Sequence, residues 1–400
     1  MAEHIEQPAR KVPVLQRFDV VVVGGGVGGV AAALAAARTG ASTCLIEKAA
    51  ALGGLATLGH VVVYTPMCDG RGRQVVGGIG EELMHLSIAD GYGEIPPAWR
   101  EGTSAAERAG TRLHTRFNSA SYMLALEEVA LNAGVTLYYD MRFCDVATDD
   151  AGGAVAAVLV ESKSGRQAIR CRTVIDATGD ADVCAAAGAE TVSLDTNAWA
   201  AWFYTFNGQS LDLHKLQAPF DRFGRPVEGQ TGYRGDDVES VTRHLIDSRA
   251  EVRKRLAALR EADGPTPFVA MLPQVPDLRM TRRLVGACEL TRADDHRPFD
   301  DGIGLIGDWR EPGPIWSIPF RSLRAAAVPN LLAVGRCCSA DQTVWDATRI
   351  IPGCVVTGQA AGTAAAIAVA DTDGRFDRLD VAAVRERLAR DGAMLEVSPT

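Results

Sequence analysis

The sequence predicts an α/β protein whose core is a parallel sheet assembled from segments that lie far apart in the chain. Four consecutive valines, 20–23, predict a buried parallel strand, because β-branched side chains suit a pleat that is covered on both faces. A glycine-rich turn and an alanine-rich helix follow at once, and a second apolar strand is expected at 42–46. This order of elements is typical of a nucleotide-binding unit.

The turn after the first strand has the G-x-G-x-x-G spacing of a dinucleotide site. Gly24 would make the turn, Gly26 would let a pyrophosphate approach the backbone, and Gly29 would let the helix pack close to the strand. The helix N-terminus would offer N–H groups and a partial positive charge to the phosphates. Glu47 ends the second strand, 23 residues after Gly24, where an acid is expected to meet the ribose hydroxyls. A doubly wound sheet without a ligand is the alternative.

Composition restricts the class of protein. The 400 residues suit two packed domains or one large one, and 47% hydrophobic with 23% charged residues is ordinary for a globular chain. The net charge of −9, without a basic block, argues against a nucleic-acid partner. Nine cysteines without C-x-x-C spacing predict reduced thiols, no zinc site and a cytoplasmic location. The polar first residues do not resemble a signal peptide.

The uncharged run at 350–370 has the length of a membrane span but contains Pro352, Gly353, Gly358, Gln359 and Gly362. A buried helix of a protein that does not enter a membrane explains these residues better. The Gly358-x-x-x-Gly362 spacing then indicates close packing inside the core.

Several later segments are expected to rejoin the first sheet. A strand at 170–175 runs into Asp176-Ala177-Thr178-Gly179-Asp180, and another at 330–336 precedes a helix at about 355–369. Residues 191–325 differ, with clustered aromatic side chains and one long charged helix at about 238–260. We therefore expect a Rossmann-like cofactor domain from 18–60, 118–190 and 326–372. An inserted, mainly-sheet substrate or cap region would comprise 61–117 and 191–325, and 373–400 would form a C-terminal helix and tail.

Four blocks of the sequence together resemble a known family. They are VVVGGGVGGVAAALAAARTGA with IEK, LGGLATLG with CDGRGRQVVGGIGEEL, VIDATGDADV, and NLLAVGRCCSA with RIIPGCVVTGQAAGTAAA. In this order they resemble the FAD-dependent oxidoreductase family, within the flavoprotein disulfide-reductase-like superfamily, in the branch that lacks a separate NAD(P)H domain. The resemblance covers about residues 18–372.

The resemblance implies that FAD is the cofactor and assigns its binding residues. Gly24, Gly26 and Gly29 would lie on the pyrophosphate and Glu47 on the adenosine ribose. The remaining implied contacts are Lys48, Gly53 and Gly54 along the ribityl side, Phe143 at the adenine, Ala177, Thr178 and Gly179 closing that end, and Gly335, Arg336, Gly353, Cys354 and Val355 at the ribityl chain and flavin.

The reaction itself is left open by the resemblance. We expect a two-electron transfer between FAD and a small organic substrate, of the oxidase or dehydrogenase type. Reduction of an activated C=C bond is the alternative among enzymes, and an electron-transfer subunit that works with a partner is the alternative from another class. Because a second strand–GxGxxG–helix unit is missing from the sequence, NADH and NADPH are expected to be poor reductants.

Three residues are candidates for catalysis. His60 follows the second glycine pair and would act as an acid, a base or an anchor, although a lone histidine is often structural. Arg282, with Arg283, would clamp a substrate carboxylate, the alternative being solvated or ion-paired arginines. Arg349 precedes the uncharged helix that is expected to approach the flavin.

The neighbouring Cys337 and Cys338 have two interpretations. A redox dithiol would exchange electrons with the flavin, but a disulfide between neighbours is strained. Inert packing beside the cofactor is the preferred interpretation, because cysteine is a common small buried residue.

Overall fold

The main sheet has a parallel core, as the sequence predicts. A computed structural model describes residues 5, 9–149, 153–221, 225–264 and 266–396. Strand β1 (Val14–Val23) pairs in parallel with β2 (Thr43–Ile46) and with β8 (Gly165–Asp176). Two further parallel strands, β5 (Thr136–Tyr138) and β16 (Leu331–Ala333), add to β2 and β8. The four consecutive valines 20–23 of β1 are at most 2% exposed, which explains the apolar run.

The same sheet continues as an antiparallel extension. The N-terminal half of β8 pairs with β7 (Val155–Ser162), which pairs with β6 (Arg142–Thr148), giving the order β5-β2-β1-β8-β7-β6. Strand β6 is half exposed, and its residues lack the apolar run that marks β1. β1 begins at Val14, before residue 18, where the predicted cofactor domain starts. The exposed residues Val14, Gln16 and Arg17 extend the strand because they pair with β8.

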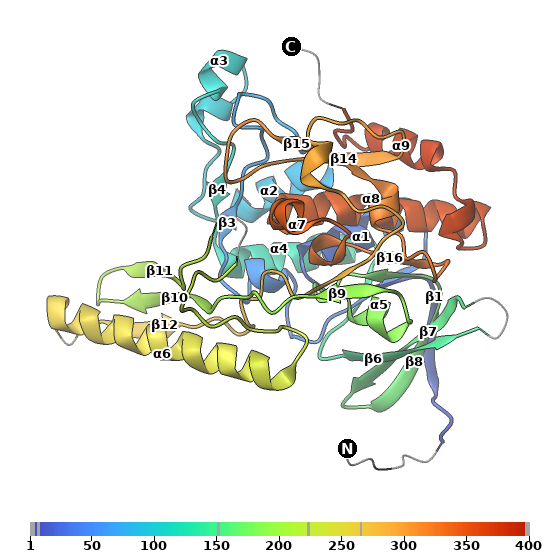
Figure 1. Cartoon of the computed structure of the whole chain (residues 1–400), viewed down its shortest axis with the longest axis horizontal. Coiled ribbons are helices and arrows are strands. Elements are labelled where there is room, and N and C mark those ends of the chain that lie inside the picture. The colour runs from blue at the N-terminus through green and yellow to red at the C-terminus, as the bar shows by residue number, and fades with distance from the viewer. Residues whose placement is uncertain (1–4, 6–8, 150–152, 222–224, 265, 397–400) are drawn as a thin grey trace.

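Two helices pack against each other on one face of the sheet (Figure 1). They are α1 (Val27–Arg38) and α8 (Ile351–Asp371). A Cβ at Gly358 would lie 2.1 Å from the carbonyl oxygen of Gly28, and one at Gly362 would lie 2.0 Å from that of Ala32. The Gly358-x-x-x-Gly362 spacing therefore serves close packing of α8 on α1. Although α8 is long and apolar enough to span a membrane, 89% of its most apolar stretch is buried inside the protein.

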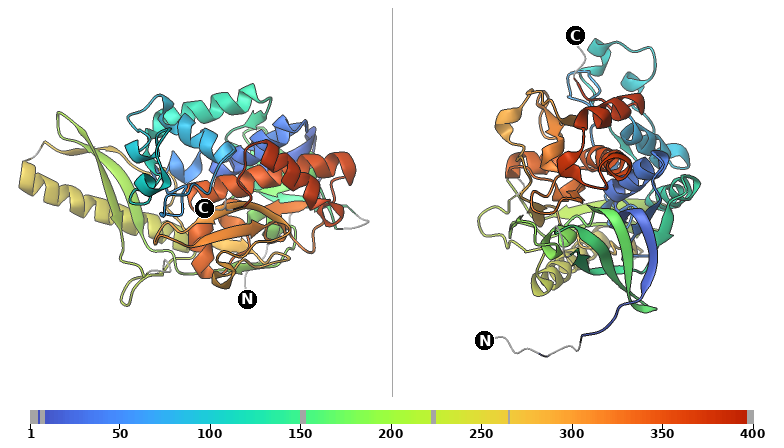
Figure 2. Two further views of the ribbon diagram at one scale, coloured as in Figure 1. Left: turned by 90° about the horizontal axis from the view of Figure 1, so that it is seen from above. Right: turned by 90° about the vertical axis from the view of Figure 1, so that its right-hand side faces the viewer.

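The body contains further helices besides this pair (Figures 1 and 2). They are α2 (Ile79–Ala89), α3 (Ala105–Arg108), α4 (Ser119–Asn132), α5 (Asp182–Ala186), α7 (Gln342–Thr348) and α9 (Val381–Arg390). Among them α9 is the C-terminal helix that the sequence predicts. Side chains at the N-caps of α4 and α9, Asn118 and Asp380, accept hydrogen bonds from the first turn.

The inserted residues form small sheets and a projecting arm. In the arm, β10 (Ala200–Phe206) pairs with β11 (Leu211–Gln217) and β12 (Phe268–Met271), and α6 (Val238–Asp263) covers one face. Figure 2 shows the arm extending away from the body. The other pairs are β9 (Thr191–Ser193) with β13 (Arg282–Leu284), β14 (Gly302–Gly307) with β15 (Ile315–Pro319), and β3 (Val63–Tyr64) with β4 (Thr115–Arg116).

The contact between α1 and α8 predicts that Gly358→Ala destabilises the fold. Alanine would add about 1 kcal/mol of helix propensity. Since its Cβ would lie 2.1 Å from a backbone oxygen, the helices must separate, and overpacking of this kind costs about 1–3 kcal/mol or more. Because a contact of 2.1 Å puts the cost near the upper end of that range, we expect a net loss of about 1–2 kcal/mol in urea unfolding.

Gly110→Ala is the control, since a Cβ at Gly110 would meet no atom within 4 Å in the described part of the chain. Equal stability of the two variants would contradict the close packing of α1 on α8.

Candidate functional site

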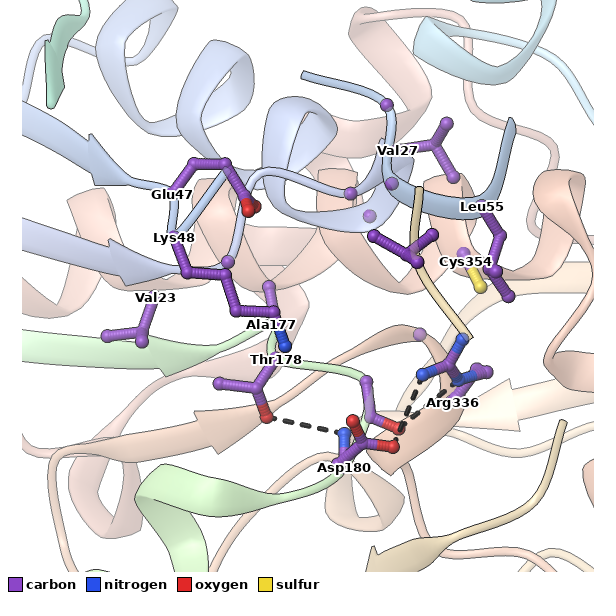
Figure 3. Close-up of a pocket in the computed structure, with 18 of the residues that line it drawn as sticks. Val23, Val27, Glu47, Lys48, Leu55, Ala177, Thr178, Asp180, Arg336 and Cys354 are labelled. Carbon is purple, nitrogen blue, oxygen red and sulfur yellow. Dashed lines mark hydrogen bonds and ion pairs between the residues drawn. The ribbon is translucent and has the colours of Figure 1, made fainter. Parts of the chain in front are cut away.

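A large cavity lies at the carboxyl ends of β1, β2 and β8, where ligands bind in open α/β sheets. Its volume is about 1290 Å³ with the mouth included. The lining residues are Val23, Gly24, Gly26, Val27, Gly28, Ile46, Glu47, Lys48, Gly53, Gly54, Leu55, Ala56, Leu58, Met141, Arg142, Phe143, Ala177, Thr178, Gly179, Asp180, Asp182, Val275, Pro276, Leu278, Val334, Gly335, Arg336, Arg349, Ile351 and Cys354. Figure 3 shows part of this wall.

The absence of a side chain has a different consequence at each glycine of the motif after β1. Gly24 has φ +104°, and a Cβ there would lie 2.5 Å from the Ala177 carbonyl oxygen. A Cβ at Gly29 would lie 1.9 Å from the Gly24 carbonyl oxygen, so this glycine packs and does not line the cavity. At Gly26 a Cβ would meet no atom within 4 Å among the described residues. Gly26 therefore leaves open space at the N-terminus of α1.

Glu47 bridges the end of β2 and the glycine turn. Its Oε2 accepts a hydrogen bond of 2.6 Å from the Gly25 backbone N–H, and Oε1 accepts one of 2.7 Å from that of Ala49. The residue is 8% exposed and lines the cavity. The carboxylate is therefore fixed beside the turn, with lone pairs that remain for a ligand.

The second glycine pair lies directly against the first turn. The Gly53 N–H donates to the Gly25 carbonyl oxygen at 2.8 Å, and both Gly53 and Gly54 have positive φ, +99° and +55°. A Cβ at Gly54 would lie 3.2 Å from the Cα of Gly26. The absence of side chains at this pair therefore lets its backbone lie directly against the first turn.

The loop after β8 is held in shape by Asp176. This carboxylate is buried and accepts hydrogen bonds from the Thr178 backbone and hydroxyl and from the Cys184 N–H, and burial raises its pKa. Next to it, Arg336 pairs with Asp180 at 3.3 Å, and its Nε donates to the Gly179 carbonyl oxygen (Figure 3). The fixed loop and this ion pair form one wall of the cavity.

The end of the cavity near the first turn of α8 is mostly apolar. Leu55 and Leu58 come from the segment after the second glycine pair, and Ile351 and Cys354 come from α8. The Leu58 carbonyl oxygen accepts a hydrogen bond of 2.8 Å from the Gln274 N–H, which brings residues 275–278 of the inserted region to the cavity. Arg349 is the charged residue directly before α8.

The cavity gathers most of the residues that the sequence predicts for the cofactor. They are Gly24, Gly26, Glu47, Lys48, Gly53, Gly54, Phe143, Ala177, Thr178, Gly179, Gly335, Arg336 and Cys354. Gly29, Gly353 and Val355 do not line it, since they pack behind the helix ends. The individual contacts of these residues with a cofactor stay predictions.

Two of the three catalytic candidates lie outside the cavity lining. His60 is 7% exposed, its Nε2 is 3.3 Å from the Leu272 carbonyl oxygen, and its ring packs edge-on against Tyr204. Burial lowers the pKa of His60, so the ring is neutral at pH 7. These contacts give His60 a structural position where the inserted region meets the body.

The two neighbouring arginines have protein partners. Arg282 donates to the Asp182 carboxylate at 2.7 Å and to the Asp180 carbonyl oxygen at 2.8 Å. Arg283 pairs with Glu289 and is not a lining residue. The geometry therefore does not support a substrate clamp at these two positions, whereas Arg349 does line the cavity.

Several lining residues were not expected from the sequence. Asp180 directly follows the predicted Ala177–Gly179 block, so its position in the sequence could have identified it as a lining residue. Residues 275–278 carried no comparable signal, because a tertiary contact with Leu58 places them at the cavity.

The side chains of Cys337 and Cys338 belong to different parts of the core. Cys337 packs with Val183 and Cys184, and its Sγ accepts a hydrogen bond from the Ala181 N–H. Cys338 packs with the opposite cluster and lies 3.7 Å from the Thr348 hydroxyl. Both are free thiols, and neither lines the cavity, which supports the interpretation as packing residues.

A search of the described residues for three or more clustered histidine, cysteine or acidic side chains finds no group that could hold a metal ion.

Comparison with solved structures gives distant similarities. The chain is 14% identical to a geranylgeranyl bacteriochlorophyll reductase-like protein from Thermoplasma acidophilum, with 94% of this chain and 83% of that chain covered and a TM-score of 0.48. It is 16% identical to a 3-ketosteroid-delta4-(5alpha)-dehydrogenase from Rhodococcus jostii, with 88% and 97% covered and a TM-score of 0.41.

Comparison with protein families is decisive. The family described as "FAD dependent oxidoreductase" matches residues 19–201 and 195–388, which is nearly the whole chain. The match includes the glycine turn, Glu47, the loop after β8 and the start of α8. The chain belongs to the FAD-dependent oxidoreductase family, and FAD is its cofactor.

Proposed function

We propose that FAD lies along the cavity, with its adenosine at Glu47 and its flavin at the start of α8. In this arrangement Glu47 accepts hydrogen bonds from the ribose, Phe143 lies by the adenine, and Lys48 extends along the loop after β8 (Figure 3). Gly335 and Arg336 would hold the ribityl chain, near the flavin.

The residues at the turn fit a pyrophosphate. The backbone at Gly26 is open to the cavity, as the missing Cβ contacts indicate, and it caps the N-terminus of α1. A helix N-terminus favours an anion through its N–H groups and its dipole. Gly26 and the facing Gly54 therefore provide a cradle that a side chain would fill.

The proposed reaction is the two-electron oxidation of a small organic substrate, an alcohol, an amine or a ring C–H, by an oxidase or dehydrogenase mechanism. When bound, FAD supplies the acceptor for the hydride. The observation that carries this proposal is the apolar lining at the end of the cavity near α8, which suits a small organic substrate, with Arg349 as a charged residue that could orient it.

The chain's own residues act there by binding and orienting. Leu55, Leu58 and residues 275–278 exclude water from this end, and the N-terminus of α8 favours negative charge that develops close to it. The acidic residues of the lining already have partners within the protein. Glu47 accepts hydrogen bonds from backbone N–H groups, Asp180 pairs with Arg336, and Asp182 pairs with Arg282.

We also propose that the partner is a small molecule, that the protein binds neither nucleic acid nor membranes, and that it works in the cytoplasm. The net charge of −9 supports the absence of nucleic acid. The nine free cysteines suit a reducing compartment.

Anaerobic mixing of the purified holoenzyme with a panel of alcohols, amines and cyclic compounds tests the reaction. We expect at least one compound to bleach the flavin absorption, and NADH and NADPH to do so far more slowly in stopped flow. A flavin that these compounds leave oxidised, but that dithionite reduces and an activated alkene reoxidises, would favour the C=C reductase instead. Rapid reduction by NADH would contradict the proposal.

Gly26→Ala tests the cradle. Since Gly26 has φ −63° and a Cβ there meets no atom of the described residues, the apo-protein should keep its stability. The methyl group would occupy the space proposed for the pyrophosphate, so FAD should bind about tenfold more weakly or worse, a loss of about 1.4 kcal/mol. Titration of the apo-protein with FAD measures this.

Gly24→Ala is the contrasting variant, because φ +104° and the Ala177 oxygen make it destabilising in the absence of FAD. Normal FAD affinity in Gly26→Ala would show that the pyrophosphate lies elsewhere.

Glu47→Ala should weaken FAD binding by roughly tenfold to a hundredfold, because hydrogen bonds to a charged group contribute about 1.5–3 kcal/mol. Part of the loss would come from the turn, whose Gly25 N–H loses its acceptor. Titration with FAD, with Glu128→Ala on the exposed side of α4 as control, measures the effect. Unchanged affinity would mean that Glu47 does not bind the ribose.

A further inference from the structure

Residues 272–278 form one wall of the α8 end of the cavity and contain no helix or strand. This segment, here called the strap, connects β12 to β13. Val275, Pro276 and Leu278 line the cavity, whereas Leu272, at the start of the strap, is 39% exposed. The strap therefore separates the α8 end of the cavity from solvent.

The opposite wall of this end belongs to the core of the body. Ile351 and Cys354 lie in the first turn of α8, which packs along α1. Leu58 is 7% exposed, and its N–H donates to the carbonyl oxygen of Gly54 at 2.8 Å. These residues cannot move without disturbing the helix pair or the glycine cradle, whereas the strap is attached to the body by few contacts.

The chain is firmly anchored directly after the strap. The backbone N–H groups of Arg279 and Met280 both donate to Oδ1 of Asn197, at 2.7 and 3.0 Å. Asn197 is 2% exposed, and its Nδ2 donates back to the Met280 carbonyl oxygen at 3.1 Å. The next carbonyl oxygen, that of Thr281, accepts from the Leu194 N–H at 2.8 Å. Residues 279–281 are therefore a fixed point.

The first residues of the strap are held more lightly. Within the part of the chain that the structure describes, two hydrogen bonds join residues 272–276 to the body. The Gln274 N–H donates to the Leu58 carbonyl oxygen at 2.8 Å, and the His60 ring lies with Nε2 3.3 Å from the Leu272 carbonyl oxygen. The strap is thus fixed at one end and latched at the other.

The contacts of His60 define its role as the side chain of this latch. A carbonyl oxygen only accepts, so Nε2 carries the proton and donates to Leu272. Nδ1 is then an acceptor, 3.4 Å from the Ser119 hydroxyl at the start of α4. The ring also packs edge-on against Tyr204, with the centroids 5.6 Å apart. His60 is therefore held from the body and from the arm.

The backbone of His60 connects the latch to the proposed FAD cradle. Its φ of +56° lies in a region that L residues rarely adopt, and this sharp bend ends the segment that begins at Gly53 and Gly54. A Cβ at Gly54 would lie 3.2 Å from the Cα of Gly26. A short segment thus carries the glycine pair at one end and the latch at the other.

We propose that His60 is a positioning residue that latches the strap over the α8 end of the cavity, and that the strap opens at this latch to admit the substrate. The strap turns about residues 279–281, and Pro273 and Pro276 restrict its backbone, which favours movement as a unit. When closed, it places Val275 and Leu278 against the bound substrate. This inference rests on the proposed function, since it assigns the entry to that same site.

Amide hydrogen exchange of the holoenzyme, followed by mass spectrometry, tests the two ends of the strap. After correction for intrinsic rates, we expect the amides of residues 272–278 to exchange at least about tenfold faster than those of residues 279–281. Exchange that is equally slow in both stretches would show a fixed wall and overturn the proposal.

His60→Phe keeps a ring against Tyr204 but removes the N–H donor. We expect exchange in the strap to rise a further fivefold or so, with residues 279–281 unchanged. His60→Gln, whose side-chain amide can donate to the same carbonyl oxygen, should restore the exchange of the natural protein. His85→Phe is the matched control, because His85 lies on α2 with its side chain 57% exposed. A role in stability alone would give neither the selective change nor the rescue.

The rate at which dithionite reduces the bound FAD in stopped flow measures access to the flavin. We expect His60→Phe to be reduced about fivefold faster than the natural protein, and His60→Gln and His85→Phe at its rate. Faster exchange of the strap with an unchanged rate of reduction would overturn the role of the strap in access.

FAD content and thermal unfolding show whether each variant folds. If His60→Phe does not fold, the exchange of the natural protein and of Ser119→Ala, which lacks the hydroxyl near Nδ1, carries the test. We then expect faster exchange in the strap of Ser119→Ala, and an unchanged strap would overturn the latch.

These measurements need no substrate, so their failure is distinct from failure of the proposed function. Bleaching of the flavin by a panel compound, in a protein whose strap does not open, would leave the proposed oxidation standing and overturn only this inference. A strap that opens as expected, in a protein that no panel compound reduces, would support the latch and contradict the proposed oxidation.

Discussion

The contact of α8 on α1 is the constraint on which the cavity depends. Gly358 and Gly362 let the helix backbones touch at Gly28 and Ala32, and this fixes both helices in parallel with their N-termini at the same place. Parallel dipoles repel each other, and two positive helix ends at one cavity favour an anionic ligand. The packing of the core thus sets the electrostatics of the site.

The same contact explains why a discontinuous chain forms one cofactor site. Helix α1 comes from the first segment and α8 from the last, and β16 returns to β8 just before α8 begins. The inserted residues 61–117 and 191–325 form the arm and the small sheets, and among the described residues they contribute Val275, Pro276 and Leu278 to the cavity lining. A large insertion is therefore tolerated because it enters and leaves at the surface of a core that is already closed.

Residues that a local pattern specifies could be placed at the cavity from the sequence. Gly24, Gly26 and Glu47 occupy fixed places in a strand–turn–helix–strand unit, so their spacing suffices. Side chains whose position depends on tertiary contacts could not be predicted. His60 contacts Leu272 and Tyr204 of the inserted region, and Arg282 pairs with Asp182. No spacing in the sequence predicts either contact.

The residues that the sequence could predict and those that it could not belong to different parts of the cavity. In the proposed arrangement, the parallel sheet and the glycine segments would contact the part of FAD that is the same in every reaction, so their geometry has few solutions. The α8 end of the cavity combines Ile351 and Cys354 of α8 with Val275, Pro276 and Leu278 of the insertion. A change in the insertion can therefore alter the substrate while the cradle for FAD stays intact, since the two parts meet only at the flavin end of the cavity. The shape of that end of the cavity is accordingly set by packing between distant segments, which no motif in the sequence specifies.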